Sequence, residues 1–179
     1  MNIDLCGGVK PYGNGYLNLD VIKQADIVWN ITDNNYTLPF KDNEVNNIYA
    51  SHIIEHFPYV KSLELLTDCY RAMNTNGYIE LHTVDADIVI ERLSTKTTLD
   101  REHKLLCKNI PKSIRYIFMS NYRIFNYENS IHNKYQEHKS MWTKEGLVDT
   151  LKHIGFKNIK ECNKAQEHKT YDLAIKGYK

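Results

Sequence analysis

The sequence of 179 residues lacks the features that mark several protein classes. Its four cysteines are widely spaced and form no CxxC pair, so neither a zinc ribbon nor a disulfide framework is indicated. The net charge is only +1, so a nucleic-acid-binding protein would have to gather its positive charge on one face. Nucleic acid is therefore a disfavoured partner, although the net charge alone does not exclude it.

Long apolar runs are also missing from the sequence, and none would cross a bilayer. The first predicted strand begins within a few residues of Met1, which leaves no room for a signal peptide. We therefore expect a cytoplasmic protein with no membrane partner. A reducing compartment fits best, because the cysteines show no pairing pattern. The composition, with 42% apolar and 25% charged residues, fits one soluble domain spanning residues 1–179. Nothing in the sequence indicates an oligomeric state.

Short apolar runs alternate with helical patterns along most of the chain. We predict helices over residues 58–73, with a stop at 74–77, and over 143–154, with Thr143 as N-cap and Gly155 as the stop. Alternating strands and helices favour a mostly parallel sheet, and the last two runs predict an antiparallel pair at its edge. The predicted strands cover residues 3–6, 16–20, 26–30, 45–50, 78–84, 156–162 and 171–176.

The region of about residues 88–140 has an irregular helical pattern and is rich in tyrosines and basic residues. We interpret it as a helical cover on the domain. Tyrosines stack on sugars or bases and basic residues suit phosphate, so the cover is a candidate lid or acceptor site. A plain cover with solvated charges is the equally supported alternative.

The stretch of residues 38–57, LPFKDNEVNNIYASHIIEHF, places polar side chains directly after a predicted strand. In open α/β sheets, ligands bind in the crevice beyond the carboxyl ends of the strands. Ser51, His52, Glu55 and His56 are therefore well placed to line a binding site.

Two earlier strands end in residues typical of a nucleotide site. The first runs into Gly7 and Gly8, and the second ends in Asp20, where a nucleotide-binding α/β unit places the carboxylate that holds ribose hydroxyls. The glycine turn and the acid are closer than the usual separation of about twenty residues. The helix between these strands should therefore be reduced or missing.

The order and spacing of six segments resemble the class I S-adenosylmethionine-dependent methyltransferases, specifically the methyltransferase type 11-like group. The segments are IDLCGG, GYLNLD, LPF, ASHIIEH, CYRAMNTNGYIEL and LKHIGF. The resemblance implies a Rossmann-like, seven-stranded, mostly parallel sheet with one antiparallel edge strand, trimmed at the N-terminus and between the first two strands. It also implies methyl transfer from S-adenosylmethionine to a small-molecule or glycan-like acceptor.

The same resemblance implies the cofactor-binding residues. Cys6 stands where the family usually has the first glycine of the loop beneath the methionine part of the cofactor, and Asn30 stands where an aspartate usually contacts the adenine region. The implied set is Asp4, Cys6, Gly7 and Gly8 in the loop, Asp20 and Val21 at the ribose, Asn30 and Ile31 near adenine, and Ser51 and His52 at the methionine end.

Methyl transfer is an in-line displacement, so the protein chiefly has to align the acceptor with the methyl group. A histidine near its ordinary pKa would take the proton of a hydroxyl or amine acceptor. We predict His52 first as this residue, followed by His138 and Asp85. His82 is a further candidate, expected to face the same crevice as Asp85.

Other interpretations stay open. His52, Glu55 and His56 match HxxEH, the inverted zincin motif, but a zinc hydrolase needs a third ligand and His52 follows a strand directly; we assign no metal ligands. Glu55 and His56 would otherwise hold the following helix in place. Cys6 in the glycine loop makes a non-catalytic cofactor-binding protein conceivable. The lack of a full GxGxxG disfavours a dinucleotide oxidoreductase.

Overall fold

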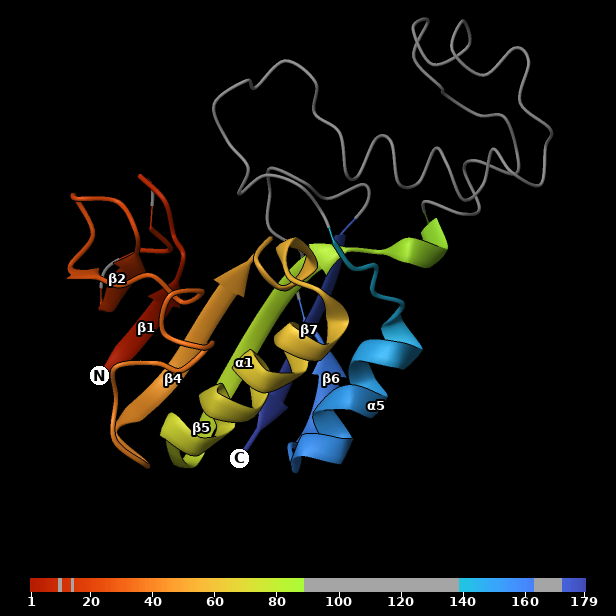
Figure 1. The fold of residues 1–179 in the computed structure, drawn as a ribbon. Helices are drawn as coiled ribbons and strands as arrows, with labels where there is room; N and C mark the ends of the chain where they lie inside the picture. Colours follow the sequence, from red (N-terminus) through yellow and green to blue (C-terminus); the bar gives the residue numbers. More distant parts are fainter. Residues whose placement is uncertain (10, 14, 89–138, 163–171) are drawn as a thin grey trace, which may run out of the picture.

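The fold comes from a computed structural model, which describes residues 1–9, 11–13, 15–88, 139–162 and 172–179. These residues form one seven-stranded sheet with the strand order β3-β2-β1-β4-β5-β7-β6 (Figure 1). The strands are β1 (Asn2–Leu5), β2 (Tyr16–Asp20), β3 (Ile27–Val28), β4 (Val45–Ser51), β5 (Met73–Val84), β6 (Lys157–Glu161) and β7 (Asp172–Tyr178).

The pairing of the strands confirms the predicted α/β sheet with one antiparallel strand. β3, β2, β1, β4 and β5 pair in parallel, and β7 runs antiparallel to both β5 and β6. The antiparallel strand β7 lies one position inside the edge of the sheet, which β6 forms. The described residues that link β1 to β2 contain no helix, as the short spacing from glycine turn to acid predicts.

Two α-helices lie on the same face of the sheet (Figure 1). They are α1 (Tyr59–Ala72) and α5 (Lys144–Ile154), close to their predicted ranges. The Thr143 side chain accepts a hydrogen bond from the Gly146 amide, and Gly155 ends α5 with a φ of 123°. Among the described residues, no helix combines the length and apolar character needed to cross a lipid bilayer.

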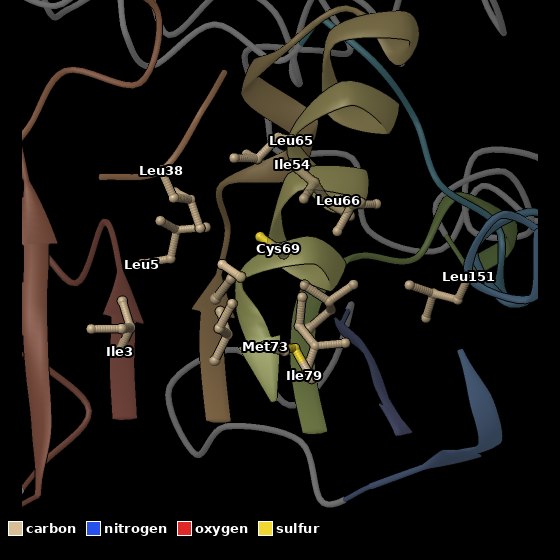
Figure 2. Close-up of a cluster of buried hydrophobic side chains, with 14 of the residues drawn as sticks. Ile3, Leu5, Leu38, Ile54, Leu65, Leu66, Cys69, Met73, Ile79 and Leu151 are labelled. Atoms are coloured by element: carbon tan, nitrogen blue, oxygen red, sulfur yellow. The ribbon is translucent and has the colours of Figure 1, made fainter. Parts of the chain in front are cut away.

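The apolar core lies between the sheet and these helices (Figure 2). Alternate residues of a strand face opposite sides, so Ile3 and Leu5 of β1 point into the core together. Ile79 of β5 joins them, and Leu65 and Leu66 close the core from α1. The opposite face of the same strands carries Asp4, Tyr49, Glu80, His82 and Lys176.

The predicted start of β5 and the predicted extent of β3 differ from the structure. The predicted turn at residues 74–77 belongs to β5, where the pairing shifts from Val45 opposite Met73 to Asn47 opposite Tyr78. The turn survives as an irregularity inside a long strand, and glycine is needed at position 77 because a Cβ there would lie 2.1 Å from the Asn46 carbonyl oxygen. The predicted strand at 26–30 shortens to Ile27–Val28. The proposed cover at 88–140 lies almost wholly outside the described residues.

Candidate functional site

A cavity of about 470 Å³ lies beyond the carboxyl ends of β1 to β4. Its size falls within the range of small-molecule sites. Its lining comes from segments that follow each of these strands, together with the chain that leads into α5. The lining residues are Cys6, Asp20, Val21, Trp29, Asn30, Ile31, Thr32, Tyr36, Ile53, His56, Phe57 and Lys139.

Half of the predicted cofactor-binding residues line this cavity. They are Cys6, Asp20, Val21, Asn30 and Ile31. The other five, Asp4, Gly7, Gly8, Ser51 and His52, are not part of the lining, and several of them support it from behind. The lining residues of this set lie at the end of β2 and in the segments that follow β1 and β3, whereas Asp4 lies inside β1.

Asp4 and Gly7 form a tight contact beneath the first loop. Asp4 is 2% exposed and accepts a hydrogen bond of 2.6 Å from the Tyr12 amide. Burial raises the pKa of Asp4, and the Tyr12 hydrogen bond partly opposes this. A Cβ on Gly7 would lie 2.1 Å from the Asp4 carboxylate. Gly7 is therefore required by contact with the protein itself, whereas the resemblance attributes the glycine to the cofactor.

Cys6 occupies the position in this loop where a glycine is expected. Its φ is 59°, in the left-handed region that side chains with a Cβ adopt only at a cost. Burial raises the pKa of the Cys6 thiol, and the charges of Asp20 and Asp4 add to the effect. The thiol therefore stays protonated and contributes an uncharged wall to the cavity.

Asp20 ends β2 and holds the loop while facing the cavity. Its Oδ2 accepts a hydrogen bond of 2.9 Å from the Gly8 amide, and its Oδ1 accepts one of 3.3 Å from the Ile22 amide. A carboxylate offers about four acceptor positions, so further hydrogen bonds from a ligand are possible. Ligand hydroxyl groups are suitable donors.

The Asn30 side chain is occupied within its own turn. Its Oδ1 accepts hydrogen bonds from the Thr32 amide at 3.1 Å and from the Thr32 hydroxyl at 2.8 Å. Its Nδ2 donates to Asp33 at 2.7 Å. This amide therefore stabilises the turn after β3, and its direct contact with an adenine ring remains a prediction.

Three aromatic residues of the lining escaped the sequence analysis. Trp29 donates its ring N–H to the Thr37 carbonyl at 2.9 Å, and Tyr36 packs edge-on against Phe57 with ring centroids 5.1 Å apart. The available signals were Trp29 near the end of the predicted third strand and Phe57 directly after HIIEH. The apolar rings suit a flat ligand such as a purine.

His52 is fixed between two carboxylates. Its Nδ1 lies 2.9 Å from Glu55 Oε1 and its Nε2 lies 3.4 Å from Asp172 Oδ1, and both acids are 1% exposed. Burial lowers the pKa of His52, but the hydrogen bonds and charges of Glu55 and Asp172 outweigh burial and raise it. His52, with a φ of 54°, thus ties the end of β4 to β7.

His56 lines the cavity from the short 3-10 helix η1 (Ile54–His56). The HxxEH residues therefore span a strand end and a 3-10 turn, whereas the inverted zincin motif places both histidines on one α-helical face. His52 also directs its ring to Glu55. This geometry gives a zinc hydrolase no support.

The remaining predicted residues lie elsewhere. Ser51 ends β4 opposite His82 of β5, and His82 is 2% exposed beside Glu80 on the polar face. The Asp85 side chain accepts a hydrogen bond of 3.0 Å from the Asp87 amide, and the Asp85 backbone forms an isolated parallel β-bridge with Trp142. None of these three lines the cavity. His138 lies outside the described residues.

Comparison with solved structures agrees with this fold. No family model matches the sequence, and no curated protein is similar to it. A S-adenosylmethionine-dependent methyltransferase from Mesorhizobium loti is similar over 99% of this chain and 90% of its own, with a TM-score of 0.59 and 11% identity.

Two further structures are similar over 99% of this chain. A methyltransferase from Archaeoglobus fulgidus has a TM-score of 0.56 and 16% identity over 85% of its length. A possible histamine N-methyltransferase from Thermotoga maritima has a TM-score of 0.54 and 13% identity over 81% of its length. In its fold, this chain is similar to the S-adenosylmethionine-dependent methyltransferases.

Proposed function

We propose that this protein binds S-adenosylmethionine in the cavity beyond β1 to β4 and transfers its methyl group to a small-molecule or glycan-like acceptor. The observation that carries the proposal is the position of Asp20, at the end of the second strand and in the cavity lining. Nucleotide-binding α/β sheets place their ribose-binding carboxylate at this point. The type 11-like subgroup stays a prediction, since no family model matches.

The lining residues fit the three parts of the cofactor. Asp20 would accept hydrogen bonds from the ribose hydroxyls, and the rings of Trp29 and Phe57 offer an apolar contact for adenine. Lys139 is a cationic residue of the lining, and a cation there would suit a carboxylate such as that of the methionine part. When bound, the cofactor supplies an activated methyl group on a sulfonium.

The described residues lead us to test His56 first as the proton acceptor. His56 lines the cavity, whereas both ring nitrogens of His52 face carboxylates. We propose His52 as a positioning residue that keeps the strand ends fixed, and its catalytic role remains a prediction, as do those of Asp85 and His138. An acceptor that loses its proton as its lone pair attacks the methyl carbon would deliver that proton to His56.

Calorimetry with S-adenosylmethionine and its demethylated product tests cofactor binding. We expect the wild-type chain to bind both and Asp20→Ala to lose binding, since the variant removes the carboxylate that would hold the ribose. Asp149→Ala is a matched control, because Asp149 is 64% exposed on α5. No binding by the folded wild type would overturn the proposal.

A panel of small hydroxyl and amine acceptors, with labelled S-adenosylmethionine, then tests transfer. Methylated product that disappears in His56→Gln supports the proposed proton acceptor. Cofactor binding without transfer to any acceptor would instead favour the non-catalytic cofactor-binding protein.

A further inference from the structure

A second cluster of chemically active side chains lies on the polar face of the sheet, away from the cavity. Glu80 and His82 come from β5, and Cys162 follows β6. One possible ligand atom from each lies within 4.8 Å of the others. His82 Nε2 lies 3.0 Å from Glu80 Oε1.

The strand register leaves room between these groups. Ala174 of β7 is the pairing partner of His82 on one side, and its carbonyl accepts a hydrogen bond of 3.0 Å from the Cys162 amide on the other. Glu80 lies two residues before His82 and therefore on the same face. Ala174 therefore lies between His82 and Cys162 in the sheet, and its small side chain lets the side chains of its two neighbours approach each other.

We propose that Glu80, His82 and Cys162 bind a Zn²⁺ ion above Ala174. Thiolate, imidazole and carboxylate are the three ligand types that Zn²⁺ takes in proteins. Mg²⁺ and Ca²⁺ prefer sites made of oxygen atoms alone, so they fit this set less well. Three protein ligands leave the fourth tetrahedral position to water. The ion would join β5 to the end of β6 across β7.

The positive charge of Lys176 should weaken the affinity of this site for a cation. Its ammonium lies 2.8 Å from Glu80 Oε2, which leaves the other carboxylate oxygen toward His82. The Lys176 ammonium also lies 4.1 Å from the centre of the Tyr78 ring, which gives it a second favourable contact. A neighbouring positive charge weakens cation binding, so removing it should strengthen the site.

Zinc binding at this site should release a proton. A cysteine thiol has an ordinary pKa of about 8.5, so the Cys162 side chain would enter the site chiefly in its protonated form at neutral pH. Only a thiolate binds the metal, so the thiol proton must leave when the ion enters. The Glu80 carboxylate needs no such step, because a carboxylate is ordinarily ionised at neutral pH.

Titration of the full-length, reduced and chelator-treated protein with Zn²⁺ tests the proposal. We expect one equivalent to bind with proton release, and Co²⁺ in its place to show a thiolate charge-transfer band. Cys162→Ser and His82→Gln should each weaken binding by roughly tenfold or more. Cys6→Ala removes a thiol from the other site and should leave zinc binding unchanged.

Lys176→Met provides a second and opposite readout, since it should bind Zn²⁺ more tightly than the wild type. Circular dichroism confirms that each variant is folded. No stoichiometric zinc in the wild type, or unchanged affinity in all three site variants, would overturn the proposal. Asp20→Ala should keep zinc binding, so this test is independent of the proposed methyl transfer.

Discussion

The two faces of the central sheet are stabilised by different kinds of interaction, although the same strands form both. The face beneath α1 and α5 buries Ile3, Ile48 and Ile79, which are all 0% exposed. The other face carries Tyr49, Glu80 and His82, which are also buried but contact one another through rings, hydrogen bonds and charge. Burial of apolar area is non-directional and insensitive to pH, whereas a polar network depends on geometry and protonation. Substitutions of Leu65, His52 and Glu80 test this contrast.

The largest effect is expected on the apolar face. Leu65→Ala removes a side chain that is 0% exposed in the centre of the core, which should lower the free energy of unfolding by about 3 kcal/mol. Urea denaturation at pH 5 and pH 8 should give the same loss. Leu17→Ala is the matched control, because Leu17 is 40% exposed and should cost less than about 0.5 kcal/mol. A strong pH dependence of the Leu65 effect would contradict the contrast.

His52→Asn tests the polar contacts at the strand ends. Asparagine tolerates the positive φ, so the variant chiefly removes the ring from Glu55 and Asp172. We expect a loss of about 2 kcal/mol at pH 6.

The pH dependence of that loss has a definite sign. The folded pKa of His52 is raised, so its contribution is complete below the unfolded value of about 6.5 and is lost as the pH rises through the folded pKa. Urea denaturation at pH 6 and pH 9 should show a smaller difference at pH 9. His153→Asn, at an exposed position on α5, is the control. An equal difference at both pH values would count against the charged His52.

Glu80→Gln should have a smaller effect with the opposite pH dependence. The variant keeps the shape but removes the charge that faces His82 and Lys176, and should cost about 1.5 kcal/mol at pH 7 in zinc-free protein. The hydrogen bond from His82 lowers the pKa of Glu80, so this contribution is present above the unfolded value of about 4.3 and is lost as the pH falls through the folded pKa. Urea denaturation of the wild type and the variant at pH 7 and pH 3 measures the stability loss and its pH dependence.

Glu64→Gln is the control for Glu80→Gln, since Glu64 forms a half-exposed pair with Lys61. It should change stability by less than about 0.5 kcal/mol. A loss in Glu64→Gln equal to that in Glu80→Gln would remove the distinction between the buried network and an ordinary surface pair.

The smallest effect compares two variants of Cys6, in the loop at the end of β1. Glycine adopts a φ of 59° without the strain that a Cβ brings, so Cys6→Gly should be more stable than Cys6→Ala by about 1 kcal/mol. This reverses the usual order of the two residues. Thermal denaturation of both variants measures the difference, and an advantage for alanine would show that the loop relaxes.

Much of the fold was predictable from the sequence, because periodic apolar residues report directly on burial. The helical pattern predicted the ends of α1 closely, and Thr143 and Gly155 were predicted as the cap and stop of α5. The position of β7 inside the edge was not, since strand order depends on pairing that the local sequence does not encode. The start of β5 was missed because Asn74 to Gly77 have the composition of a turn.

The cavity was predicted only in part, for a similar reason. Asp20 and Cys6 were identified from their places at strand ends, but Trp29, Tyr36 and Phe57 come together only once two separate connections fold over the strand ends. His52 was assigned to chemistry because it follows a strand. Asp172, its partner on β7, is 120 positions away in the chain, and no local pattern connects the two.

The contact between Gly7 and Asp4 couples the residue types that these two positions can carry. Because a Cβ at position 7 would lie 2.1 Å from the carboxylate at position 4, position 7 cannot gain a side chain unless the side chain at position 4 moves or shrinks. Related sequences should therefore change the two together, with a smaller residue at position 4 wherever position 7 carries a side chain. A profile that scores them as a pair would detect distant relatives that single-residue motifs miss.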